Sequence, residues 1–441
     1  MSLFAGVVAC ALLALVLQDA FEVMLLPRRV GRRLRFMGAY FRLAWAAWAG
    51  LAARLPPGPR RENLLSHFGA LSMLGLFAAW AAALVLGFGL LEWALQPPAG
   101  QAGGGGRSPL SEQVYMSGVT FFTVGYGDVA PRAGAARLVA VLEGGTGIGF
   151  IAVVIGYLPV LYQLFSRREA HVIRLDARAG SPPTAAAMLC RHAEAGGPAK
   201  LDELLREWEA WGAELLESHL SYPMLAYYRS QHDDQSWLAA LAAVMDCCAL
   251  VLVGAGGMPP LQARMTFAMA RQVVVEMARS FRVAPSRFEG GDRLPDAAWA
   301  RMEAAFAEAG VAWGGGPEVR AALGALRATY EPLLDGLARR LLLALPGWVP
   351  DEGAADHWGR GHRGLLARRL VERLADEGSA PALAAAPADG AGRRSGVWRR
   401  LRQRLRGGQG VPVPPRPMPG GADGGKDPRP SAAGGAAPTD P

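Results

Sequence analysis

The fold of this chain follows from one stretch of sequence, residues 123–128, which reads Thr123-Val124-Gly125-Tyr126-Gly127-Asp128. Gly125 and Gly127 have no Cβ and can adopt positive φ, so successive backbone carbonyls can face the same side. A ring of carbonyl oxygens can replace the water shell of a dehydrated cation. Thr123 can add its hydroxyl oxygen at the inner end, and Asp128 can attract cations at the outer end. Tyr126 is large enough to brace its ring outward against a pore helix. The stretch therefore predicts an oxygen-lined path for a cation.

The segments on either side of this stretch are long and apolar. Residues 63–91 contain no Asp, Glu, Lys or Arg, and residues 138–165 contain one charge, Glu143. A helix needs about 20 apolar residues to cross a bilayer, so each segment can span a membrane. In the short helical run between them, Ser111 is expected to cap the helix and Glu112 to favour its first turn. The pattern predicts a pore domain over residues 63–168, with an outer helix, a pore helix, a filter and an inner helix at residues 64–95, 111–122, 123–128 and 135–165.

This arrangement resembles the pore of potassium channels over residues 64–168, most strongly from Tyr115 to Pro131. The resemblance implies two spans with a re-entrant pore loop, K⁺ as the permeant ion, and neither a cofactor nor a further metal ion. Because one chain holds a single filter loop, a closed ring requires four copies, which implies a homotetramer. One position departs from the family, since Phe122 stands where potassium channels commonly carry Thr. We expect selectivity to be unaffected, while blocker sensitivity and inactivation stay open.

The inner helix carries the candidates for gating. Gly147 takes the place of a glycine that the family can use as a gating hinge; the alternative is that it only allows close packing against the pore helix. Pro159 lacks an N–H group and is a second hinge candidate, since it can kink the lower helix. Glu143 is an ionisable group at membrane depth, which by itself indicates a functional role. We favour a structural role for Glu143, a hydrogen bond to the pore helix behind the filter.

Basic clusters predict the topology. Arginines are concentrated in residues 28–35, occur again before the outer helix, and follow the inner helix in residues 166–168. The positive-inside rule places all three clusters in the cytoplasm. Residues 1–26 then form an extra N-terminal span, with a cleaved signal as the less favoured alternative. Asp19 and Glu22 near its cytoplasmic end are expected to pair with neighbouring arginines.

The segment between the first two spans, residues 27–62, is basic and partly aromatic. Its part from residue 36 to residue 55 contains Trp45 and Trp48, with arginines at both ends. Arginines on both sides oppose crossing, so we predict an interfacial helix on the inner leaflet. A further span is the alternative.

Residues 169–380 are predicted to form a helical cytoplasmic domain. Apolar residues recur at helical spacing over residues 201–216. Asp233-Asp234 are expected to cap a helix that runs from Ser236. Strands do not alternate with helices, which argues against the nucleotide-binding domain that many bacterial channels carry, and the glycines that follow residue 253 are better explained as a helix end. Further helical runs are expected at about residues 260–282, 296–309, 317–345 and 362–376.

A polar segment within this domain, residues 219–234, contains two histidines and two aspartates. Such side chains could bind a metal ion or sense pH. Their spacing matches no zinc pattern, so a hydrogen-bonded helix junction is the preferred interpretation.

The C-terminal segment, residues 381–441, is predicted to hold a basic helix over residues 393–406 and a disordered Gly/Pro-rich tail. The basic helix has an apolar strip and can lie on anionic membrane lipid. The net charge of +8 comes largely from such clusters, so it indicates lipid and not nucleic acid as a partner. A composition rich in Ala, Gly and Arg suggests a bacterial genome of high GC content, and therefore a bacterial inner membrane.

Together these features predict an all-α membrane protein that conducts K⁺ passively and selectively through a homotetrameric pore. An unidentified stimulus would gate it through the cytoplasmic helices, where an unidentified ligand could bind. The alternative is a membrane-anchored signalling or binding protein whose pore is regulatory or vestigial. An enzyme is not expected, because the sequence shows no nucleophile–base pair and no phosphate-binding loop.

Overall fold

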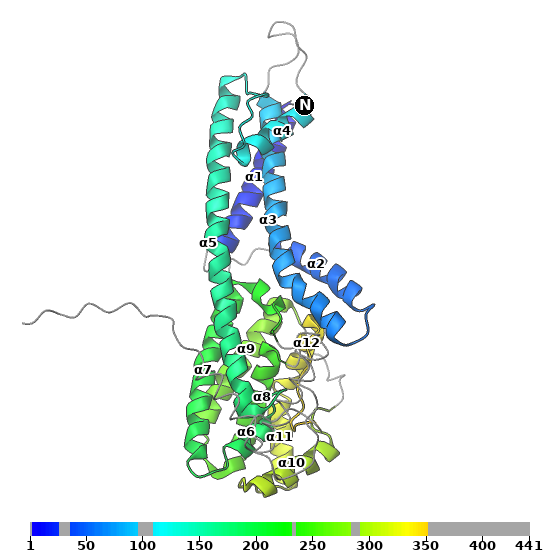
Figure 1. Cartoon of the computed structure of the whole chain (residues 1–441), viewed down its shortest axis with the longest axis vertical. Coiled ribbons are helices and arrows are strands. Elements are labelled where there is room, and N and C mark those ends of the chain that lie inside the picture. Colours follow the sequence, from blue (N-terminus) through cyan, green and yellow to red (C-terminus); the bar gives the residue numbers. More distant parts are fainter. Residues whose placement is uncertain (1, 26–35, 96–108, 232–234, 284–291, 352–441) are drawn as a thin grey trace, which may run out of the picture. The chain divides into compact units, whose positions relative to one another are not determined.

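Three long apolar helices form the membrane part of the fold (Figure 1). The computed structural model describes residues 2–25, 36–95, 109–231, 235–283 and 292–351. Within these ranges α1 (Ser2–Met24), α3 (Pro59–Leu95) and α5 (Gly134–Ala179) are the helices long and apolar enough to cross a membrane, and no β-strand occurs. The predicted all-α membrane fold, with an N-terminal span in addition to two pore spans, is confirmed.

α1 packs along α3 through a stripe of small and aliphatic side chains. Ala9, Leu13 and Val16 are buried and lie three or four residues apart, on one face of the helix. Leu13 lies against Gly87 of α3, where a Cβ would stand 2.7 Å from Leu13 Cδ2. Small residues let membrane helices approach closely, so Gly87 permits this contact.

Asp19 joins the lower end of α1 to two other helices. Its Oδ2 accepts hydrogen bonds from Met37 N and from Trp80 Nε1, each at 3.1 Å. Met37 lies in the first turn of α2 (Phe36–Ala52) and Trp80 lies in α3, so one buried carboxylate connects α1, α2 and α3. The predicted pairing of Asp19 and Glu22 with arginines falls on residues 28–35, which lie outside the described residues.

α2 packs its aromatic face on protein. Phe41 and Trp45 are buried, and the ring centroid of Trp45 lies 4.9 Å from those of both Phe68 in α3 and Tyr227. The opposite face includes the exposed Leu43. The predicted interfacial helix is therefore held to the protein on one side, and its contact with lipid stays a prediction.

A shorter helix, α4 (Leu110–Phe121), packs against both α3 and α5. It begins one residue earlier than predicted, with Pro109 as its N-cap residue and no described side chain capping it. The expected capping role of Ser111 is therefore wrong. Pro109 has φ of −62° and already sets the backbone for a first turn, so Ser111 lies within the helix. Glu112 is in the first turn, as expected.

α5 continues well past residue 165, where the inner helix was predicted to end. Its 46 residues span about 69 Å at about 1.5 Å per residue, more than twice the hydrocarbon core of about 30 Å. Val172, Leu175 and Ala179 are buried, so packing sustains the helix until Gly180, whose φ is 90°. The boundary predicted at residue 168 thus lies inside one continuous helix.

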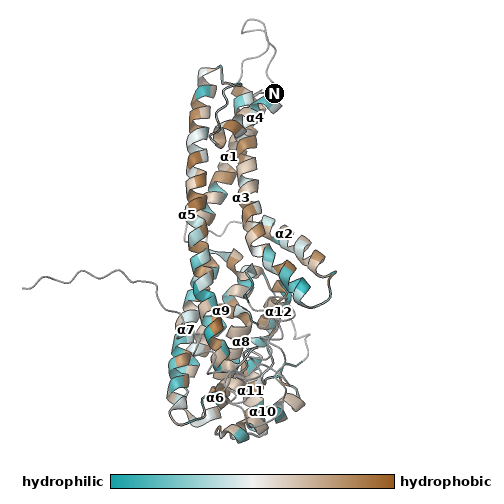
Figure 2. Ribbon diagram, in the orientation of Figure 1, coloured by the Kyte–Doolittle hydropathy of each residue, from teal (hydrophilic) through white to brown (hydrophobic). Residues whose placement is uncertain are grey.

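The helical domain that follows α5 surrounds one apolar helix, α8 (Trp237–Leu252). Every residue from Trp237 to Val251 is buried, as expected for a core helix that is apolar on all sides. Figure 2 shows the contrast between the largely brown ribbon of the membrane part of α5 and the many teal positions along the ribbon of the amphipathic α7. The other described elements of this domain are α6 (Ala185–Arg191), α7 (Gly197–Ser221), η1 (Pro223–Tyr227), η2 (Ala255–Gly257), α9 (Leu261–Phe281), α10 (Asp296–Ala309), α11 (Pro317–Arg327) and α12 (Glu331–Leu341).

Two predicted details of this domain differ from the structure. The helix predicted to run from Ser236 begins at Trp237. Ser236 is instead the N-cap of α8, since its Oγ accepts a hydrogen bond from Ala239 N at 3.0 Å. The helix predicted over residues 317–345 is divided into α11 and α12, because Pro332 has no N–H group and cannot continue a helix from the preceding turn. Gly254, with φ of 101°, ends α8 as predicted. Several predictions fall outside the described residues: Asp233-Asp234, His232, the helical run at 362–376, and the basic helix and tail.

An ionic cluster lies inside this domain and was not predicted from the sequence. Asp246 of α8 is fully buried and pairs with Arg293, which also lies 3.1 Å from Glu331. Tyr330 Oη donates a hydrogen bond of 2.6 Å to Asp246 Oδ1. These contacts tie α8 to α12, and loss of one partner would leave a buried charge uncompensated.

Candidate ion-conduction site

The predicted filter, residues 123–128, is attached by hydrogen bonds to the last turn of α4. Thr123 N donates a hydrogen bond to Thr120 O at 3.0 Å, and Val124 N donates one to Val119 O at 2.8 Å. These bonds use carbonyls at the C-terminus of α4, the end at which the helix dipole is negative. The inner end of the filter is therefore positioned by the pore helix itself.

The filter backbone alternates in handedness. Positive φ occurs at Thr123 (58°), Gly125 (65°) and Gly127 (75°), whereas Val124 and Tyr126 between them have negative φ. Alternation of this kind lets successive carbonyl oxygens turn toward one side, the arrangement that a carbonyl-lined ion path needs. The glycines were predicted to have positive φ, but Thr123 was not. A β-branched residue rarely adopts this conformation, so no propensity signal could have indicated it.

The outer end of the filter is attached to α4 by a side-chain contact. Tyr115 Oη donates a hydrogen bond of 3.0 Å to Asp128 Oδ2. The ring of Tyr126 was expected to brace against a pore helix, yet it is 71% exposed in the single chain. The described residues of one chain therefore do not cover Tyr126, and its bracing contact stays a prediction.

Glu143 lies against the pore helix α4, with which the structural interpretation expected a hydrogen bond. It is fully buried in α5, and Ser117 Oγ of α4 lies within hydrogen-bond distance of Glu143 Oε1. Ser117 Oγ also lies 2.8 Å from Val85 O of α3, so the contact joins three helices. Glu92 of α3 is a second fully buried carboxyl, and neither of its oxygens has a hydrogen-bond partner among the described residues. In the sequence, Glu92 was notable only as the first charged residue after the charge-free residues 63–91.

Two glycines let α4 approach its neighbours at backbone distance. A Cβ on Gly147 of α5 would overlap Phe121 O and lie 2.8 Å from Phe121 C. On the other side, a Cβ on Gly89 of α3 would lie 2.8 Å from Val114 Cα. The close contacts that Gly147 and Gly89 make with α4 support the packing interpretation of Gly147, and a hinge role stays a prediction. Gly89 was not singled out in the sequence, because nothing local distinguishes it from other helical glycines.

Pro159, the second hinge candidate, lies inside α5, which continues on both sides of it. Its neighbour Gly156 has no atom within 4 Å of an added Cβ, as is also true of Gly145 and Gly149. This face of α5 is therefore open in one chain. The exposed apolar side chains here include Leu138, Val141, Leu142, Ile148, Ile151, Ile155 and Leu158.

The predicted polar segment after α7 forms a helix junction in its described part. His219 is buried, with Nδ1 at 2.9 Å from Leu215 O and Nε2 at 3.4 Å from Arg168 Nη1. Burial and the positive charge of Arg168 hold the pKa of His219 well below its usual range. No group of three or more His, Cys, Asp or Glu side chains is placed to hold a metal ion in the described ranges.

Comparison with known proteins identifies the pore. A family model described as an ion channel matches residues 75–163, from within α3 through α4 and the filter into α5. The chain is 33% identical over 98 residues to Protein LctB of Geobacillus stearothermophilus and 32% identical over 98 residues to Protein LctB of Bacillus caldotenax. Each match covers 20% of this chain and 72% of the relative. No solved structure matches the chain. Given these matches and the fold described above, the chain belongs to the ion-channel family, with a two-span pore of the potassium-channel type.

Proposed function

We propose that the protein is a potassium-selective channel that conducts K⁺ passively through a homotetrameric pore. The alternating backbone of residues 123–127 carries this proposal, since it suits a row of carbonyl oxygens that replaces the hydration shell of K⁺. The apolar exposure of Val124 and Tyr126 in one chain supports a ring of copies around the filter. The protein would need no cofactor and no metal ion other than the K⁺ that it conducts, and it would not be an enzyme.

The proposal places this channel in a bacterial inner membrane, with the helical domain in the cytoplasm. Arginines at the N-terminal end of α3 and in the C-terminal half of α5 favour this orientation. The exposed Arg42 and Leu43 of α2 suit contact with anionic lipid. Gating would pass through the helical domain, because α5 belongs both to the pore and to the core of that domain.

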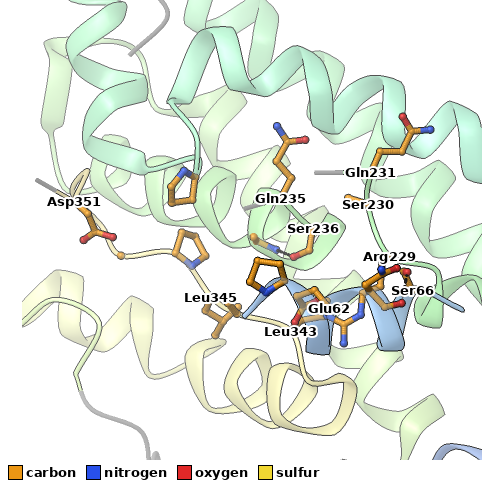
Figure 3. A pocket seen from close by; sticks show the side chains of 17 residues that line it. Glu62, Ser66, Arg229, Ser230, Gln231, Gln235, Ser236, Leu343, Leu345 and Asp351 are labelled. Atoms are coloured by element: carbon orange, nitrogen blue, oxygen red, sulfur yellow. Dashed lines mark hydrogen bonds and ion pairs between the residues drawn. The ribbon is translucent and has the colours of Figure 1, made fainter. Parts of the chain in front are cut away.

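A polar cavity suggests where a cytoplasmic ligand would bind. It has a volume of about 700 Å³ and lies between the first turns of α3, the start of α8 and residues 343–351 (Figure 3). Glu62, Asn63 and Ser66 of α3 line it, together with Arg229 and Ser236. A small polar molecule bound there would contact the outer helix α3 directly, which makes the cavity our candidate site for the unidentified ligand.

Flux through reconstituted protein tests the function. In vesicles we expect K⁺ to permeate at least about tenfold better than Na⁺, a difference of about 1.4 kcal/mol in barrier height. Gly125→Ala should abolish selectivity or conduction, because φ of 65° opposes a Cβ. Gly50→Ala is the matched control, since a Cβ there meets no atom within 4 Å. Equal K⁺ and Na⁺ permeability would refute selectivity, and absence of any flux would favour a signalling protein with a vestigial pore.

A further inference from the structure

One short segment of the helical domain contacts both the outer helix α3 and the inner helix α5. We call residues 223–228, which comprise η1 and Tyr228, the coupling segment. Tyr157 Oη of α5 lies 3.6 Å from Met224 Sδ, and Tyr227 packs its ring 5.2 Å from that of Phe68 in α3. The coupling segment thus contacts both the outer helix α3 and the inner helix α5.

Arg168 locks the coupling segment to α5. It was assigned from the sequence to a basic cluster facing the cytoplasm, but it is only 4% exposed. Its Nη1 donates to Leu225 O and its Nη2 to Tyr228 O, each at 2.8 Å, and Glu169 balances its charge at 2.8 Å. Because the acceptors are backbone carbonyls, the coupling segment cannot move away without breaking two hydrogen bonds of this buried guanidinium.

Tyr228 fills space between the outer helix α3 and the inner helix α5. A Cβ added to Gly69 of α3 would lie 2.8 Å from Tyr228 Cδ2 and 3.0 Å from its Cγ. On the other side, the ring of Tyr228 lies 5.7 Å from the ring of Phe165 in α5. Its neighbour Arg229 pairs with Glu62 of α3 at 3.2 Å, as Figure 3 shows. One aromatic ring therefore lies between Gly69 of α3 and Phe165 of α5.

The other face of the coupling segment belongs to the helical domain. Tyr227 packs its ring 5.7 Å from Phe281 of α9, and Trp237 Nε1 of α8 donates a hydrogen bond of 3.4 Å to Ala226 O. Arg229 Nη2 also donates to Leu341 O, at 2.8 Å, at the end of α12. Movement of these helices must therefore displace the coupling segment.

We propose that the coupling segment transmits movement of the helical domain to both the outer helix α3 and the inner helix α5. Tyr228 is the positioning residue that sets the separation of these two helices, and Arg168 holds the coupling segment to α5. This inference rests on the proposed channel function and specifies its regulation. It requires the bulk of the Tyr228 ring and the absence of a side chain at residue 69.

Single-channel recording of the full-length protein in lipid bilayers tests the proposal. Tyr228→Ala should change open probability by about fivefold or more, in the range of typical coupling between sites. Tyr228→Phe keeps the ring and should behave as wild type. Gly69→Ala should also shift open probability, and this effect should disappear in the Gly69→Ala/Tyr228→Ala double variant, where the ring is absent. Single-channel current should stay unchanged in all four, since the filter is untouched, and Gly50→Ala serves as the neutral control.

The outcomes separate the coupling from the function on which it rests. Wild-type protein without current would overturn both proposals. Wild-type current combined with unchanged open probability in Tyr228→Ala would overturn the coupling alone. So would an effect of Gly69→Ala that persists undiminished without the ring. Tyr228→Ala introduces no overlap, so its result decides the matter even if Gly69→Ala prevents assembly.

Discussion

At the scale of single residues, the pore depends on the places where a side chain is missing. Gly147→Ala would put a Cβ into the backbone of Phe121, an overlap that side-chain rotation cannot relieve. Overpacking of this kind typically costs about 1–3 kcal/mol. We therefore expect Gly147→Ala to lower the melting temperature of the assembled protein in detergent, whereas Gly50→Ala in α2, with open space around it, should not.

A second substitution at the same glycine, Gly147→Pro, separates packing from hinge bending. If Gly147 acts as a hinge, Gly147→Ala should lower open probability and Gly147→Pro should raise it. If Gly147 only permits packing, both substitutions should reduce assembly, and Pro more than Ala. A Gly147→Ala protein that melts like wild type but opens less often would contradict the packing interpretation.

At the scale of elements, the junction of α7 with α5 should be sensitive to acid. Burial and the charge of Arg168 hold the pKa of His219 well below its usual range, so the ring stays neutral in the folded protein. As the pH falls below about 6.5, the unfolded chain takes up a proton that the folded protein refuses, and stability declines by at most about 1.4 kcal/mol per pH unit. His192 is buried too, and burial lowers its pKa as well, so it acts in the same direction.

The expected result is a melting temperature that drops between pH 7.5 and pH 5 and drops less in His219→Gln. The measurement is thermal unfolding of the full-length protein in detergent. His67→Gln is the control, since His67 is exposed on α3. An identical pH dependence in wild type and His219→Gln would show that the junction does not titrate as described.

At the scale of the whole molecule, assembly should be a property of the pore. One chain leaves its filter and a face of α5 exposed, with Val141 at 72% and Ile155 at 66%. We expect native mass spectrometry to show four copies, both for the full chain and for a chain that ends at Gly180. Ending at Gly180 keeps α5 whole, whereas the domain boundary predicted from sequence would cut through it. A truncated chain that is only monomeric would make the helical domain an assembly module.

Much of this architecture could be predicted from the sequence because the signals are local. Membrane spans follow from uninterrupted apolar runs, and residues 63–91 and 138–165 lie in the observed spans. The filter could be located because Gly125 and Gly127 permit a backbone that other residues oppose. The bounds of α9 and α10 were predicted to within a residue from their helical periodicity.

Only the tertiary structure decided what each polar or small residue does, because that depends on the helix it meets. Arg168 follows the inner helix in a basic cluster, and only the fold shows that it binds Leu225 O and Tyr228 O inside the protein. Only the fold shows that the backbone of Phe121 lies against Gly147. The sequence by itself determined the spans, the place of the candidate filter and the helical class of the domain, since those rest on local hydropathy and backbone freedom. Partners distant in the chain are set by packing, and packing is a property of the assembled helices.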